Sequence, residues 1–219
     1  MVVSSVATSS GRSRRSGQPR RTQAERRAAT SAALLEATVD CLAHEGYAQT
    51  TMRRVAERAG VSPGALQHHF ETKVELLGRT REHIGREFLR EVTADPPSPS
   101  LPPRQRNEIL LDRQWTFFCG PRSQAATELA IAARTDEELR ARLRQAEEEN
   151  AHLYVAGAAA IYPELAGPQF TQLAVTGLAT LRGLAMLRLV NERAAELAWP
   201  STRAHLLALF EQFVGHPEA

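Results

Sequence analysis

The dipeptide Ser62-Pro63, which follows Gly60 by two residues, constrains the fold of this chain more than any other feature. Serine at the N-cap of a helix accepts a hydrogen bond from an unpaired N–H of the first turn. Proline at the next position lacks the N–H that would otherwise be unpaired. Glycine is favoured just past the end of a helix, where the backbone turns left-handed. Residues 60–62 therefore predict a short turn between a helix ending near Ala59 and a helix beginning at Pro63.

The same stretch also spells G-x-S-x-G, the motif of the nucleophile elbow of serine hydrolases, with Ser62 as the nucleophile. That elbow follows a β-strand, and the backbone N–H of the residue after the serine contributes to the oxyanion hole. Pro63 has no N–H, and residues 51–59 carry apolar side chains at spacings of three and four, as an amphipathic helix does. We therefore interpret Ser62 as a helix cap rather than as a nucleophile.

Two helices joined by a short turn that contains glycine form a helix-turn-helix motif, an arrangement used to bind DNA. A plain corner between two helices of an all-α protein has the same local pattern, so this stretch alone leaves both interpretations open. The small core of the motif is predicted to consist of Val55, Ala56, Ala59, Val61, Leu66 and Phe70.

Apolar periodicity and capping residues predict an all-α fold, since no segment has the convincing alternation of a β-strand. Thr72 and Glu75 form a predicted capping box, and Thr135 and Glu138 form a second one. The expected helices are residues 22–45, 51–59, 63–69, 72–92, 104–118, 123–133, 135–162, 169–193 and a last helix that opens at Ser201.

A proline-rich segment at residues 94–103 cannot continue a helix and is the predicted linker between two domains. Residues 22–93 form the predicted N-terminal domain with its connecting helix, and residues 104–219 form the C-terminal domain. Residues 1–21 are rich in serine, glycine and arginine and predict a disordered tail. This tail is either simply solvated or an arginine arm that follows DNA phosphates or enters the minor groove.

The charge of the chain is unevenly distributed, although its formal net charge is only +2. Residues 1–83 hold 13 Arg or Lys against 8 Asp or Glu, whereas residues 84–219 hold 14 against 17. A basic first third fits a surface that faces phosphate groups.

Cysteine and histidine usage argues against a disulfide framework and against a metal site. Cys41 and Cys119 are far apart without paired spacing, and the adjacent His68 and His69 cannot share a metal from one helix face. No apolar run reaches 18 residues, and no apolar segment follows the N-terminal arginines. We therefore expect a soluble cytoplasmic protein without membrane contact, metal or cofactor.

The helix expected near the C-terminus is apolar around most of its circumference over residues 173–190, so it must be covered on both sides. It is either a single buried central helix or a surface for self-association. With a DNA-binding domain upstream we expect dimerisation, and the candidate interface residues are Leu178, Leu181, Ala185, Leu206 and Phe210.

Residues 32–77, "AALLEATVDCLAHEGYAQTTMRRVAERAGVSPGALQHHFETKVELL", resemble the DNA-binding domain of the TetR family of transcriptional regulators. The likeness rests on Gly46-Tyr47, the paired threonines 50 and 51, "VAERAGVSPGAL", His69-Phe70 and Lys73. It implies an N-terminal three-helix helix-turn-helix domain and a C-terminal helical ligand-binding and dimerisation domain. It also implies a homodimer whose last two long helices form a four-helix bundle, and a palindromic DNA operator.

The expected DNA contacts lie on and beside the helix-turn-helix. Thr51 is expected to offer its hydroxyl to a phosphate, and Arg53 to read a guanine edge unless it is merely a solvated surface arginine. Small side chains early in the second helix allow close approach to the groove, and Gln67 stands where the family usually has an aromatic residue. The full set is Thr51, Arg53, Arg54, Ser62, Gly64, Ala65, Gln67, His68, His69 and Lys73.

Aromatic side chains of the C-terminal domain either line an effector pocket or belong to its plain core. The candidates are Trp115, Phe118, Tyr154 and Tyr162. A pocket of this kind suits a small, largely apolar molecule that releases a repressor from DNA. The competing hypothesis is an all-helical enzyme or lipid carrier with an incidental first domain. The basic N-terminal part and the rejected nucleophile favour the ligand-responsive repressor.

Overall fold

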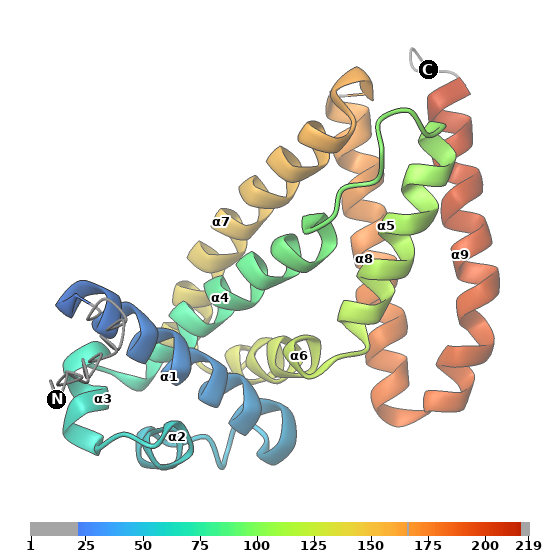
Figure 1. The fold of residues 1–219 in the computed structure, drawn as a ribbon. Coiled ribbons are helices and arrows are strands. Elements are labelled where there is room, and N and C mark those ends of the chain that lie inside the picture. Colours follow the sequence, from blue (N-terminus) through green and yellow to red (C-terminus); the bar gives the residue numbers. More distant parts are fainter. Residues whose placement is uncertain (1–21, 166, 216–219) are drawn as a thin grey trace, which may run out of the picture.

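The computed structural model describes residues 22–165 and 167–215, drawn as a ribbon in Figure 1. All regular structure in these residues is helical, which confirms the predicted all-α fold. The predicted tail, residues 1–21, lies outside the described residues. The elements are α1 (Gln23–Glu45), α2 (Met52–Ala59), α3 (Pro63–His69), α4 (Lys73–Thr93), α5 (Pro103–Phe118), α6 (Pro121–Ala133), α7 (Glu137–Ile161), the 3-10 turn η1 (Pro163–Leu165), α8 (Pro168–Val190) and α9 (Glu192–Gly215).

Helices α1, α2 and α3 pack around a small apolar core at one end of the molecule, which we call the head (Figure 1). Met52, Ala59 and Val61 pack against this core from the α2–α3 segment. Of the six residues predicted for the core of the motif, Val55, Ala56, Leu66 and Phe70 are buried in it, and the other two pack against it. Its buried side chains are Leu34, Leu35, Ala37, Cys41, Val55, Ala56, Leu66, Phe70 and Leu76.

Helix α4 belongs to the head and also to the larger helical unit formed with α5–α9, which we call the body. Leu76 near its start is buried in the head core, whereas Ile84 and Phe88 are buried in the body core. Along this second half, α4 packs closely on α7, since a Cβ at Gly85 would overlap Asn150 Oδ1. The body core thus begins well before the proline-rich segment, and one continuous helix joins it to the head.

In the body, α8 and α9 are long helices that lie side by side in opposite directions, with α5 packed against both (Figure 1). Helices α4, α6 and α7 complete the body on the side of the head. Leu181 of α8 and Phe210 of α9 are buried in its core, together with Phe88, Phe117 and Leu129 from the other helices.

Of the two predicted capping boxes, the first forms only in part and the second does not form. Thr72 Oγ1 accepts a 3.1 Å hydrogen bond from the Glu75 N–H, as predicted, but the Glu75 carboxylate accepts from the Glu71 N–H instead of the Thr72 N–H. At α7 the predicted cap is wrong by one residue. Asp136, rather than Thr135, accepts the 2.9 Å hydrogen bond from the first turn, because its carboxylate reaches the free N–H of the third helical residue.

The predicted start of the last helix at Ser201 is also wrong. α9 begins at Glu192, because Asn191 Oδ1 accepts a 3.0 Å hydrogen bond from the Ala194 N–H and so caps the helix. Pro200 lies inside α9, where it removes one backbone donor. The helix nevertheless continues through Pro200, because residues before and after the proline, such as Ala195 and Leu206, are buried in the packing.

Candidate functional site

The α2–α3 turn has the local geometry that its sequence predicts. Gly60 adopts a left-handed conformation with φ 68°, and Ser62 Oγ accepts a 3.1 Å hydrogen bond from the Ala65 N–H. Pro63 occupies the first position of α3. The hydroxyl of Ser62 is thus engaged as a helix cap, as expected.

Most of the residues predicted to contact DNA are exposed on α2, α3 and their caps, and we call these exposed residues the outer face of the head. Gly64 at the start of α3 has no heavy atom within 4 Å of the place where a Cβ would lie, so the backbone there is open to a ligand. Ala65, His69 and Lys73 are half-buried. The exposed members of the predicted set are Thr51, Arg53, Arg54, Ser62, Gly64, Gln67 and His68.

The two neighbouring arginines of α2 have different environments. Among the described residues Arg53 pairs only with Glu57, with 2.8 Å between its Nε and the Glu57 Oε1, and 83% of its side chain is exposed. Arg54 donates two hydrogen bonds to Glu45 at the end of α1, which also pairs with Arg58. The hydrogen bond from Arg54 lowers the pKa of Glu45. Arg53 is therefore free to reorient toward a ligand, whereas Arg54 braces α2 against α1.

Lys73 is more constrained than a free surface lysine. Its Nζ lies 4.2 Å from the centroid of the Tyr47 ring and 3.5 Å from the Tyr47 carbonyl oxygen. Burial lowers the pKa of this ammonium group. A phosphate that binds Lys73 would have to approach its ammonium group beside the Tyr47 ring, at the start of α4.

His68 and His69 show no metal-site geometry. Their ring centroids are 6.1 Å apart with the rings nearly perpendicular, and burial lowers the pKa of His69. Across residues 22–165 and 167–215, no group of three His, Cys, Asp or Glu side chains converges as a metal site.

A large cavity of the body has a volume of about 720 Å³ and lies between α4, α6, α7 and α8. Phe118 and Tyr154, both predicted as pocket residues, line it together with Phe88, Phe117 and Leu178. Burial raises the pKa of Tyr154 to about 12. The volume is within the range of small-molecule sites, and the walls are mostly apolar.

The other two predicted pocket residues lie elsewhere. Tyr162 lines a neighbouring cavity of about 80 Å³, where its buried hydroxyl has no hydrogen-bond partner among the described residues. Trp115 lines neither of these two cavities. It stacks on Trp199 of α9 with ring centroids 4.8 Å apart, so it joins α5 to α9 as part of the packing.

Sequence reasoning missed the charged end of the large cavity. Arg81 of α4, Glu147 of α7 and Arg182 of α8 all line it. Arg81 is only 6% exposed, and its Nη2 lies 2.6 Å from the Glu147 Oε1. No sequence signal identifies these residues, since single charges on amphipathic helices usually face solvent.

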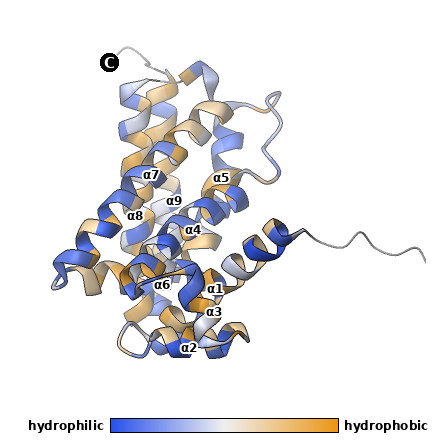
Figure 2. Ribbon diagram, turned by 90° about the vertical axis from the view of Figure 1, so that its left-hand side faces the viewer, coloured by the Kyte–Doolittle hydropathy of each residue, from blue (hydrophilic) through white to orange (hydrophobic). Residues whose placement is uncertain are grey.

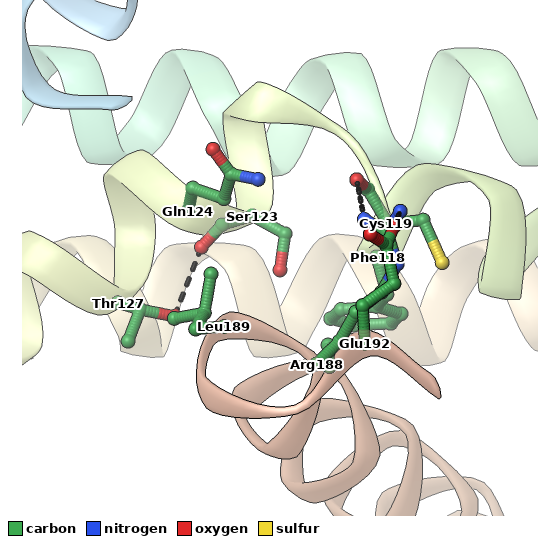
Figure 3. Close-up of a pocket in the computed structure, with 9 residues that line it drawn as sticks. Phe118, Cys119, Ser123, Gln124, Thr127, Arg188, Leu189 and Glu192 are labelled. Atoms are coloured by element: carbon green, nitrogen blue, oxygen red, sulfur yellow. Dashed lines mark hydrogen bonds and ion pairs between the residues drawn. The ribbon is translucent and has the colours of Figure 1, made fainter. Parts of the chain in front are cut away.

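A third, more polar pocket of about 350 Å³ lies beside the α5–α6 corner (Figure 3). Arg188 Nη1 donates a 3.0 Å hydrogen bond to the Cys119 carbonyl oxygen, and its other terminal nitrogen pairs with Glu192. Burial raises the pKa of the Cys119 thiol. Ser123 and its neighbour Phe118 also border the large cavity, so this pocket adjoins that cavity.

The residues predicted to form the dimer interface require a correction. Leu181, Ala185, Leu206 and Phe210 are buried within the protomer, and Leu178 is half-buried in the wall of the large cavity. Their apolar pattern reflects the core of the body rather than an outer surface. Figure 2 colours the body helices by hydropathy. The large apolar side chains that α8 and α9 do expose are Val175, Met186, Leu187, Leu189, Val190, Leu197 and Leu209.

Comparison with known proteins relates this geometry to one family. Residues 34–80 match the profile described as "Bacterial regulatory proteins, tetR family". An uncharacterized HTH-type transcriptional regulator of Mycobacterium tuberculosis is 37% identical over 129 residues, which are 57% of this chain and 63% of that protein. The regulator CymR of Pseudomonas putida is 35% identical over 131 residues, 60% of this chain and 64% of CymR. The matches thus span slightly less than two thirds of these relatives.

Solved structures share the fold over most of the chain. A TetR-family regulator from Rhodococcus sp. is 26% identical with a TM-score of 0.65, covering 84% of this chain and 97% of that one. FadR from Bacillus subtilis in complex with stearoyl-CoA is 15% identical with a TM-score of 0.61, covering 80% and 97%. These proteins and the sequence relatives are regulators rather than enzymes, in agreement with the rejection of Ser62 as a nucleophile.

Proposed function

We propose that this chain is a DNA-binding transcriptional repressor of the TetR family, because residues 34–80 match the profile of that family. Relatives that match this part of the chain are named as HTH-type regulators and, in two cases, as repressors. The observation that carries the proposal is the outer face of the head. There α2 and α3, which the capped turn joins, expose Thr51, Arg53, Gln67 and His68.

In this proposal α3 enters the major groove and its N-terminal end approaches the base edges. Gly64 has open space where a side chain would be, and Ala65 has a methyl group of the size that contacts a thymine methyl. Arg53 is the proposed base reader, because it is the more exposed of the two arginines and is paired only within its own helix. Thr51 and Lys73 are the proposed phosphate contacts.

We infer that two copies of the chain associate through α8 and α9 and bind a palindromic operator. Both helices expose large apolar side chains, among them Val190 at 89% and Leu197 at 72%. Among the described helices, α8 is long and apolar enough to cross a membrane by length and composition alone. Arg182 lies within it, however, and a charged side chain inside a bilayer is costly. We therefore assign this apolar surface to helix pairing between copies in the cytoplasm.

The large cavity of the body is the proposed effector site. Solved structures with this fold are named in complex with small molecules, stearoyl-CoA in FadR and imidazole in EbrR. Helix α4 lines the cavity with Ile84, Phe88 and Leu89 and reaches the head core with Leu76. A ligand that shifts α4 would therefore change the spacing of the two α3 helices in a dimer and weaken operator binding.

The proposal is tested by fluorescence anisotropy with the duplex DNA upstream of the chain's own coding sequence, measured over a series of salt concentrations. We expect saturable binding that is stronger than binding to random duplex of the same length and that weakens steeply with salt, because phosphate contacts release counterions. Equal affinity for both duplexes at every salt concentration, over a range of upstream fragments, would contradict the proposed specific repressor.

A further inference from the structure

The large cavity has a charged end and an apolar end, which lie at different positions along the paired helices α4 and α7. At one end Arg81 of α4 pairs with Glu147 of α7, and at the other end Phe88 of α4 contacts Tyr154 of α7, with ring centroids 5.8 Å apart. Phe88 lies seven residues after Arg81 in α4, and Tyr154 lies seven residues after Glu147 in α7. At a rise of 1.5 Å per residue, the two ends are about 10 Å apart. The cavity is therefore amphipathic along its length.

Positive charge predominates among the lining residues. Arg81, Arg134 and Arg182 line the cavity, against the single carboxylate of Glu147. That carboxylate is shared, since its Oε1 lies 2.6 Å from Arg81 Nη2 and its Oε2 lies 3.8 Å from Arg182 Nη2. The Glu147 side chain is 47% exposed, so it neutralises the guanidinium groups only partly.

Among the three arginines that line the cavity, Arg81 is the most buried, so incomplete neutralisation of its charge is the most costly. Its side chain is 7% exposed, and burial lowers its pKa, while Glu147 acts in the opposite direction. A buried charge is costly unless it is fully paired and hydrogen-bonded. A planar guanidinium has five N–H donors arranged to hold a carboxylate in two places, and one half-exposed glutamate does not use them all.

We propose that the cavity binds an amphipathic monocarboxylate, whose carboxylate pairs with Arg81 and Arg182 and whose apolar body extends about 10 Å toward Phe88, Phe117 and Tyr154. A medium-chain fatty acid or an alkyl-substituted benzoate has this chemistry and fits a cavity of about 720 Å³. A neutral apolar molecule would leave the guanidinium excess unpaired, and a cation would be repelled by it. The inference rests on the proposed function only in treating this molecule as the effector.

The test is isothermal titration calorimetry of the full chain without DNA. The probes are octanoate and 4-butylbenzoate, each compared with its neutral analogue, 1-octanol and 4-butylbenzyl alcohol. We expect at least one carboxylate to bind about tenfold or more tightly than its alcohol, because hydrogen bonds to charged groups are stronger than neutral ones. Absence of carboxylate binding, or equal affinity for acid and alcohol, would overturn the proposal.

Matched variants test which arginines pair with the carboxylate of the ligand. Arg182→Gln, at a half-exposed position, should fold normally and reduce the preference for the acid, and Arg81→Gln should abolish it. Arg86→Gln on the same helix as Arg81 is the control, since Arg86 does not line the cavity. Circular dichroism checks that each variant is folded. A preference that survives in Arg182→Gln unchanged would refute the assignment even if Arg81→Gln does not fold.

The outcome is separable from that of the proposed function. Specific operator binding without carboxylate binding would overturn this inference and leave the repressor proposal intact. Carboxylate binding that depends on the two arginines, in a chain that binds no specific DNA, would support this inference and overturn the repressor proposal.

Discussion

The backbone N–H of Tyr47, just after α1, donates a 3.0 Å hydrogen bond to Oε2 of Glu128 in α6. The contact joins the head to a helix whose residues Ala126, Thr127 and Ala130 line the large cavity. Arg122 of α6 also reaches the head, with 2.8 Å between its Nη2 and Oε1 of Glu36. The head is thus fastened to the body through α6 as well as through α4.

Glu128→Ala should lower the free energy of unfolding by about 1–3 kcal/mol, because it leaves the partly buried Tyr47 N–H without its charged acceptor. Urea denaturation measures the change. Glu148→Ala is the control, since Glu148 is exposed on α7 and should change stability little. Equal, small effects of both substitutions would show that the Tyr47–Glu128 hydrogen bond does not fasten the head to the body.

Arg53→Ala should weaken binding to the specific operator by about 5- to 150-fold and relax the base preference at one position in each half-site. The physical reason is the loss of a guanidinium that pairs with a guanine edge. Lys73→Ala, as a proposed phosphate contact, should weaken specific and random DNA alike. Binding of a library of operator variants measures both effects. If Arg53→Ala lowers specific and random binding equally, its proposed role as a base reader is wrong.

Ser62→Ala should lower the free energy of unfolding by about 1 kcal/mol, because the Ala65 N–H loses its capping partner. Ser62→Asp should restore most of this loss, since aspartate caps helices as well as serine does. Chemical denaturation of the three proteins provides the comparison. An esterase activity that disappears in folded Ser62→Ala would instead revive the nucleophile that Pro63 argues against.

The double substitution Val190→Glu and Leu197→Glu should convert a dimer into a folded monomer, because both side chains are largely exposed in the protomer and would place charges in an apolar interface. Sedimentation equilibrium at micromolar concentration measures the association. Leu181→Ala should behave differently: it should destabilise the protomer by about 2–5 kcal/mol, because Leu181 is fully buried. A wild-type chain that is a stable monomer and still binds its operator would rule out the proposed dimer.

The operator and a ligand of the large cavity should oppose each other by the same factor, because linkage is reciprocal. We expect about a 5- to 150-fold effect, the usual range for allosteric coupling. Whichever of octanoate and 4-butylbenzoate binds more tightly is titrated into free protein and into operator-bound protein, and the two affinities are compared. Identical affinity in both states would show that occupation of this cavity does not control release of DNA.

The α2–α3 turn of the head could be predicted from the sequence, because the interactions that shape it are local. Ser62 and Pro63 begin α3, and Gly60 ends α2 in the predicted left-handed conformation. Each of these effects depends on backbone groups within about four residues, and only glycine adopts that conformation without strain. The exposed polar residues beside the turn could therefore be identified before the fold was known.

The roles of the apolar and charged residues of the body, in contrast, depend on how its helices pack. Periodicity shows that α8 is apolar on most sides, but it cannot distinguish Leu181, buried in the protomer, from Val190, exposed on its surface. Likewise Trp115 is packed against Trp199, 84 positions away, rather than placed in a pocket. Arg81 and Glu147 meet because α4 and α7 pack closely along their length, as the approach at Gly85 shows. Such contacts depend on how distant helices cross, which no local pattern of residues encodes.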